Sequence, residues 1–141
     1  MLFRSLGEQR VGGGVLWLTG WPVSTEAIVL FQPGRPDAMW VEHYNHLPNA
    51  RRMAIGVDVR WAERKGPARA IEELKARGAR RVGVIGSLGW SKMRALAEAF
   101  EVVDLNGDYA GVRMRKSDEE IEWMRLGAAL SDLGKIGRAH V

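Results

Sequence analysis

The chain has 141 residues, enough for one domain with a sizeable core, and its 46% hydrophobic and 27% charged content is ordinary for a globular protein. It contains no cysteine, which excludes disulfides and thiolate metal sites and favours a reducing compartment, so we expect a cytoplasmic protein. The formal net charge of +4 comes from scattered basic residues and does not indicate a nucleic-acid partner. The longest apolar run, residues 27–31, is too short to span a membrane, and no membrane partner is expected.

Short apolar runs separated by turn residues dominate the first part of the chain. They predict strands over residues 15–19, 27–32 and 38–42. A turn rich in proline and glycine separates the last two, so we expect these strands to pair as an antiparallel hairpin. Residues 43–53 are polar and irregular, and we expect at most one short helical turn there.

Strands and helices alternate in the second part of the chain. Strands are expected over residues 55–61, 81–85 and 102–105, and helices over 67–77 and 91–100. Early strands followed by strand–helix alternation predict an α/β fold, a six-stranded mixed sheet flanked by helices.

The stretch after residue 112 begins with a helix start signal. Ser117 can cap a helix while Glu120, three residues on, bonds back to it as a capping box. Behind this cap, apolar residues recur on two opposite sides of the helix: Ile121, Met124 and Ala128 on one, and Trp123, Leu126, Leu130 and Leu133 on the other. Two apolar sides indicate a helix covered from both directions, as at the junction between two domains.

The residues around this cap resemble a known domain junction. The residues that carry the resemblance are Arg113, Lys116, Ser117, Glu119, Glu120 and Ile121 (RxxKSxEEI), followed by a helix rich in small residues. Trp123, on that helix, is expected to pack between the two domains. In the creatinase, prolidase and aminopeptidase P family (M24 metallopeptidases), such a run closes a small N-terminal α/β domain and opens the "pita-bread" catalytic domain. The segment Leu16–Pro22 (LWLTGWP) is similar to the family's YLTGF strand and turn, and order and spacing agree over about residues 11–134.

The resemblance implies a domain organisation. Residues 6–115 are expected to form a creatinase-like N-terminal domain, and residues 116–135 the first helix of a truncated catalytic domain. Residues 1–5 and 136–141 resemble translated sequencing adapters, so we expect both ends to be foreign to the natural chain.

The resemblance also implies a function. The chain would be the non-catalytic N-terminal domain of a metal-dependent hydrolase similar to Xaa-Pro aminopeptidase, prolidase or creatinase, whose substrates are peptides or small amides. Its partners would be its own missing catalytic domain and a second copy in a homodimer, and its roles dimer contact and shaping of the substrate pocket. In the family two divalent ions (Mn, Co or Zn) are held by two aspartates, a histidine and two glutamates downstream, so we expect no catalytic residue, metal or other cofactor in this fragment and no activity from it alone.

Candidate recognition residues lie in the polar segment after the third predicted strand. We expect His43, Tyr44 and His46 to contact substrate, because the family's N-terminal domain helps to wall the active site, although a structural or solvated role stays open. Trp21 and Trp90 lie at element ends, where a ring can pack at an interface. Trp17 and Trp40, within predicted strands, are expected in the core, which is also the default for the other tryptophans.

Two other interpretations stay open. Some relatives keep the pita-bread architecture without metals and act as interaction modules. A free-standing α/β binding domain would instead require that both apolar sides of the helix over residues 121–133 be covered within this chain. A nucleotide site is not favoured, because Gly83, Gly86 and Gly89 lack the GxGxxG spacing.

Overall fold

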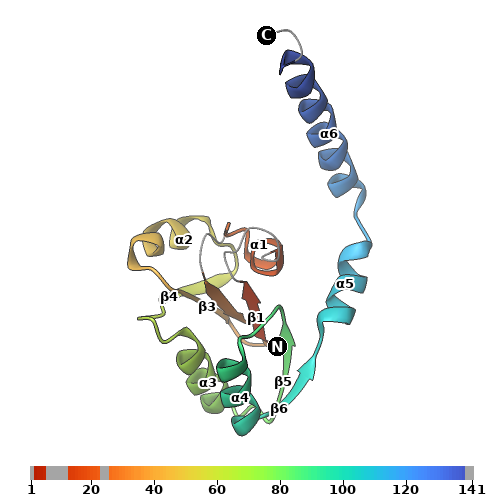
Figure 1. Ribbon diagram of the computed structural model, residues 1–141. Helices are drawn as coiled ribbons and strands as arrows, with labels where there is room; N and C mark the ends of the chain where they lie inside the picture. The colour runs from red at the N-terminus through yellow and green to blue at the C-terminus, as the bar shows by residue number, and fades with distance from the viewer. Residues whose placement is uncertain (1, 6–12, 23–25, 139–141) are drawn as a thin grey trace. The chain divides into compact units, whose positions relative to one another are not determined.

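The computed structural model describes residues 2–5, 13–22 and 26–138, with side chains described over 13–22 and 26–135 (Figure 1). The chain forms two compact units that meet between Asn106 and Gly107. The boundary predicted between residues 115 and 116 stays a prediction. None of the helices within the described ranges is long and apolar enough to cross a membrane.

Most strands of the first unit run in one direction. The strands are β1 (Leu2–Ser5), β2 (Ala27–Leu30), β3 (Asp37–Val41), β4 (Val57–Trp61), β5 (Arg81–Ile85) and β6 (Glu101–Asp104), in the spatial order β4-β3-β2-β1-β5-β6. Strand β2 is antiparallel to both of its neighbours, whereas the pairs β3–β4, β1–β5 and β5–β6 are parallel. The expected mixed sheet and the expected β2–β3 hairpin are therefore confirmed.

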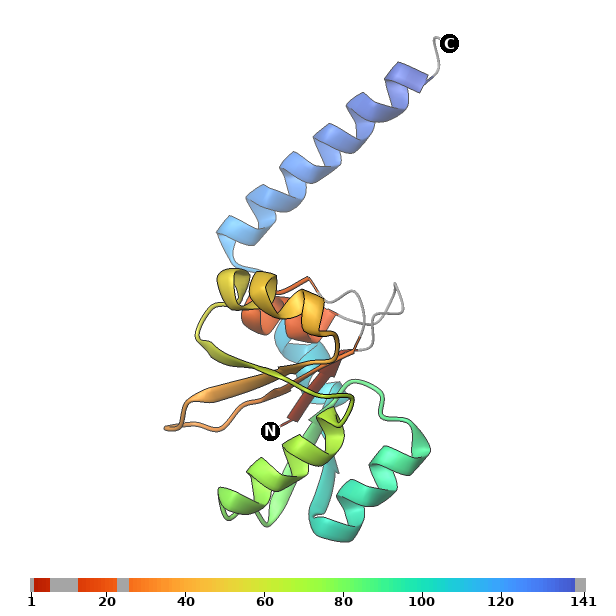
Figure 2. The ribbon, with the colours of Figure 1, turned by 90° about the vertical axis from the view of Figure 1, so that its left-hand side faces the viewer.

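Helices cover both faces of this sheet, as expected for an α/β fold. Helices α1 (Gly13–Thr19) and α2 (Leu47–Met53) lie on one face, and α3 (Gly66–Ala76) and α4 (Trp90–Ala99) lie on the other (Figure 2). A short 3-10 turn, η1 (Tyr44–His46), leads into α2, so the segment expected to be irregular is mostly helical.

The hydrophobic core under α3 and α4 follows the predicted pattern of the second part of the chain. Ala70 and Leu74 of α3 and Leu96 of α4 are buried against the sheet. Their strand partners in this cluster are Ile28, Leu30, Ala38, Trp40, Val82 and Val84. Trp40 is thus a core residue, as expected, with only 4% of its surface exposed.

The strand predicted over Val15–Thr19 is wrong: these residues form the end of α1. Val15 and Thr19, four residues apart, are buried, whereas Leu16 and Trp17 are 47% and 46% exposed, which is a helical burial pattern. Trp17 is therefore not the core residue that we expected. The segment Leu16–Pro22, which resembles the family motif, therefore contains the end of a helix and not of a strand. A run of four apolar residues is compatible with either structure, and the residues that cap the run determine which one forms.

The prediction that these six segments together form the sheet is also wrong. Those segments yield only the three-stranded group β4-β3-β2 and the separate pair β5-β6. Residues 2–5, which we expected to be foreign, pair with β2 and β5 between the two groups. The origin of residues 1–5 and 136–141 stays a prediction, and Met1 and residues 139–141 lie outside the described residues.

The second unit consists of α5 (Asn106–Met114) and α6 (Asp118–Arg138). The predicted capping box is confirmed: the backbone N–H of Ser117 donates to Glu120 Oε2 at 2.8 Å, and that of Glu120 donates to Ser117 Oγ at 3.2 Å. On α6 the apolar side chains of both predicted sides are exposed, from 36% at Ile121 to 66% at Leu133.

The cap of α1 makes a testable prediction. Gly20 has φ +72°, and its N–H donates to Leu16 O at 2.7 Å, so it ends the helix in the left-handed conformation. Gly20→Ala should lower the free energy of unfolding by about 1 kcal/mol, because a Cβ is strained at this φ. Urea unfolding measures the loss, and Gly20→Asn should lose less than Gly20→Ala. Equal losses would contradict the conformational explanation.

Candidate functional site

Four of the predicted recognition residues take part in two neighbouring sets of aromatic contacts around the segment after β3. The ring centroids of His43 and His46 lie 5.6 Å apart at an interplanar angle of 76°, and Trp21 lies 6.5 Å from His46. Tyr44 meets Trp61, at the end of β4, edge to face at 5.1 Å. We name Trp21, His43, Tyr44, His46 and Trp61 the aromatic group.

The cap of α1 positions Trp21 within this group. The Thr19 hydroxyl donates to Val15 O at 2.7 Å and accepts the N–H of Trp21 at 3.2 Å, and Thr19 is only 2% exposed. The N–H of Ile55 donates to Thr19 O at 2.9 Å, which ties the end of α1 to the chain after α2. Trp21 itself is 7% exposed, so it is the buried member of the group.

The outer members of the group face solvent. Tyr44 is 65% exposed, His43 is exposed and His46 is half-buried. An exposed imidazole and phenol above a buried indole can contact a ligand or another protein surface without changing the core.

Trp90 is not brought into the aromatic group. It is the first residue of α4, after β5, and is 80% exposed. Strands β3 and β5 end at the same edge of the sheet, but β2 and β1 lie between them. This separation amounts to about 14 Å of sheet width.

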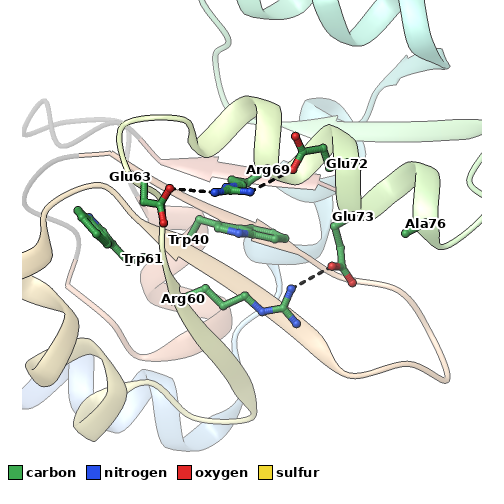
Figure 3. Close-up of a pocket in the computed structure, with 8 residues that line it drawn as sticks. All are labelled: Trp40, Arg60, Trp61, Glu63, Arg69, Glu72, Glu73 and Ala76. Atoms are coloured by element: carbon green, nitrogen blue, oxygen red, sulfur yellow. Dashed lines mark hydrogen bonds and ion pairs between the residues drawn. The ribbon is translucent and has the colours of Figure 1, made fainter.

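Sequence reasoning missed a charged cleft beside the aromatic group. Its volume is about 390 Å³, and it lies between α3 and the end of β4 (Figure 3). The side chains of Arg60 and Arg69 flank the Trp40 ring in this view, and the Arg60 guanidinium carbon lies 5.5 Å from the ring centroid. The other lining residues are Trp61, Glu63, Glu72, Glu73 and Ala76.

Every charged side chain that lines the cleft belongs to an ion pair. Arg60 donates to Glu73 at 2.9 Å, and Arg69 donates to Glu63 at 2.8 Å and to Glu72 at 3.4 Å. These pairs join α3 to the end of β4 and the loop after it. The sequence held no signal for the Arg60–Glu73 pair, because its partners are 13 residues apart on different elements.

Glu73 is the central carboxylate of this network. It accepts Arg77 Nε at 2.8 Å in addition to Arg60, and the Arg77 side chain is only 6% exposed. The hydrogen bond from Arg77, followed by that from Arg60, holds the pKa of Glu73 below its ordinary value, against the opposing effect of burial. A hydrogen bond to Asp58 in turn raises the pKa of Arg60.

The predicted junction residues lie on the segment that enters α6. Arg113 lies over the Tyr109 ring at 5.6 Å, and Lys116 Nζ donates to Met114 O at 3.2 Å. Trp123 is 65% exposed and Ile121 36%.

The residues described do not fit a metal centre. Within the described ranges, no three histidine, aspartate or glutamate side chains are grouped so that they could hold an ion.

Comparisons with known proteins bear on the fold. No protein-family model and no curated protein matches the sequence. Among solved structures, an X-Pro aminopeptidase from Thermotoga maritima MSB8 matches with a TM-score of 0.70 at 12% identity, and an Xaa-Pro dipeptidase from Bacillus anthracis with 0.68 at 18%. Each match covers 86% of this chain and 33% of the other.

A third structure, an Xaa-Pro aminopeptidase from Streptococcus pyogenes, matches with a TM-score of 0.58 at 16% identity over 73% of this chain and 76% of that one. The chain thus spans about a third of the length of the first two relatives. The structures that it resembles are prolidases and Xaa-Pro peptidases, so the resemblance read from the sequence is confirmed at the level of the fold.

The network around Glu73 predicts a pH dependence of stability. Because the pKa of Glu73 is lowered on folding, its contribution is present above the unfolded value of about 4.3 and is lost as the pH falls through the lower folded value. Glu73→Gln should cost about 1 to 3 kcal/mol near pH 7, since a buried Arg77 donor loses its charged partner. This cost should shrink below about pH 4.3.

Urea unfolding of both chains across this pH range measures the difference. Glu72→Gln is the matched control, because the Glu72 side chain is 66% exposed and lies 3.4 Å from Arg69. Its cost should be smaller than that of Glu73→Gln near neutral pH. A cost of Glu73→Gln that does not vary with pH would contradict the assignment.

Proposed function

We propose that this chain is the N-terminal, non-catalytic domain of a metal-dependent hydrolase of the creatinase, prolidase and aminopeptidase P family. The observation that carries the proposal is the fold likeness to Xaa-Pro peptidases, which covers 86% of this chain but 33% of theirs. A fold alone does not define an activity.

Two local features support the same assignment. The family-like segment Leu16–Pro22 forms a helix cap that positions Trp21, and the family-like segment from Arg113 to Ile121 contains a formed capping box. The two segments keep their family order along the chain: Leu16–Pro22 lies within the α/β unit, as a helix end and not the strand end that the resemblance implied, and the capping box follows that unit.

Helix α6 supports a following domain. Trp123, Leu126, Leu130 and Leu133 are 49% to 66% exposed on one side, and Ile121 and Met124 are 36% and 60% exposed on the other. An apolar surface of this kind fits a helix whose remaining neighbours belong to a catalytic domain, as residues 116–135 were expected to do.

The roles of the domain itself would be dimer contact and shaping of the substrate pocket. The aromatic group presents His43, Tyr44 and His46 at one edge of the sheet, above a supported Trp21. We infer that these side chains wall the substrate pocket of a catalytic domain, with a peptide or small amide as substrate, and that Trp90 contacts the second copy of a homodimer. The two divalent ions (Mn, Co or Zn) would be held by the catalytic domain and would activate water there.

The first test is to recover the complete gene, free of adapter sequence, from the source DNA and to read past Lys135. The reading frame should extend to about three times the present length, because the matches cover 33% of the relatives' chains. Two aspartates, a histidine and two glutamates should follow in family order, and the purified full protein should hydrolyse an Xaa-Pro dipeptide only with added Mn²⁺ or Co²⁺. A full frame without these ligands would instead identify a metal-less interaction module, and an early stop codon would exclude the enzyme.

The second test concerns the aromatic group in that full protein. The double variant His43→Ala, His46→Ala should raise KM for an Xaa-Pro dipeptide about tenfold, equivalent to 1.4 kcal/mol of lost binding, without changing bound metal. Asn49→Ala, an exposed change on the neighbouring helix α2, is the matched control and should leave KM unchanged. Unchanged kinetics of the double variant would reject the pocket role while leaving the family assignment intact.

A further inference from the structure

One asparagine side chain joins two loops that follow parallel strands. Asn106, the first residue of α5, accepts the backbone N–H of Gly86 through Oδ1 at 2.8 Å, so it connects the turn after β6 to the turn after β5. Its Nδ2 donates to Asp104 Oδ1 at 2.7 Å, and its backbone N–H donates to the same oxygen at 2.9 Å. Both polar atoms of the amide are therefore engaged.

The residue after Asn106 is glycine. The chain has three asparagines, and the other two, Asn45 and Asn49, precede histidine and alanine. Without a Cβ at the next position, the following backbone nitrogen meets the least steric hindrance when it approaches the asparagine Cγ. Asn106 is thus the asparagine of this chain best placed by sequence to lose its amide.

We propose that Asn106 is a site of spontaneous deamidation that the native fold protects, and that its conversion weakens the link between the two loops by removing the Nδ2 bond to Asp104. In the first step Gly107 N attacks Asn106 Cγ, a C–N bond forms, and ammonia leaves with the proton that Gly107 N gives up. Water then opens the resulting five-membered imide at either carbonyl, leaving aspartate or isoaspartate. The net reaction consumes one water and releases one ammonia.

The folded geometry opposes the first step. Asn106 has helical backbone as the first residue of α5, and this conformation keeps Gly107 N away from the Asn106 Cγ. The bonds to Gly86 and Asp104 hold the amide in place, so the attack requires that the turn open first. Asn106 is exposed, and water reaches the imide once it forms. The rate therefore depends on how often this turn opens.

The product holds the link less firmly. An aspartate at position 106 keeps an oxygen for the Gly86 N–H, and its backbone N–H can still donate to Asp104 Oδ1. It loses the Nδ2 donor, however, and places a second carboxylate where the amide lay 2.7 Å from Asp104 Oδ1, so the like charges repel. An isoaspartate also adds one atom to the main chain at the start of α5.

Mass spectrometry of the full chain, incubated at mildly alkaline pH with and without urea, tests the proposal. In urea, Asn106 should gain the mass of an amide-to-acid conversion before Asn45 and Asn49 do, and Gly107→Ala should slow it. In the folded chain the same conversion should be at least about tenfold slower than in urea, as for a reaction that proceeds only from a locally opened state.

The role of Asp104 in holding the Asn106 amide is tested by Asp104→Ala, which removes the acceptor but keeps the Asn–Gly pair. Folded Asp104→Ala should deamidate several-fold faster than the folded parent. Hydrogen exchange of the Gly86 N–H should be slow in the parent and faster in Asn106→Asp. Equal rates with and without urea, or an Asn106 that converts no faster than Asn45 in urea, would overturn the proposal.

Discussion

The common direction of five strands decides where this chain can place functional side chains. Strand β2 is antiparallel to its neighbours, and β1, β3, β4, β5 and β6 are parallel to one another. Their carboxyl ends therefore share one edge, and the segments that follow them carry the aromatic group, the charged cleft and the Asn106 link. Functional sites commonly lie at the carboxyl ends of parallel strands. The loops there do not take part in packing the helices against the sheet, so their side chains are available for binding.

The chain's local patterns predicted the elements whose signals are redundant. Residues 82–85 are uncharged and lie between a glycine-terminated helix and a glycine-rich turn, and β5 has the predicted bounds, Arg81–Ile85. Ser117 and Glu120 form a reciprocal cap because their spacing alone determines which groups can meet. Interactions between residues within one helical turn can be predicted from the sequence in this way.

Interactions between residues on different elements could not be predicted from the sequence. Four apolar residues before Thr19 fit a strand or a helix, and the outcome depended on a buried hydroxyl and a left-handed Gly20. The cleft around Trp40 needed Arg60 on β4 and Glu73 on α3 to meet, which no periodicity encodes. Four of the five members of the aromatic group were predicted: His43, Tyr44 and His46 from the polar segment after the third predicted strand, and Trp21 from its place at an element end. Trp61 was recognised only through its contact with Tyr44.

The exposed apolar sides of α6 have a practical meaning for handling the molecule. A purified chain that carries Trp123, Leu126, Leu130 and Leu133 in water presents a surface of the kind that drives self-association at high concentration. Ending the chain shortly before Asp118 removes that surface while keeping every residue of the sheet, the aromatic group and the cleft. Such a shorter form is the natural material for crystallisation and for solution spectroscopy of this fold.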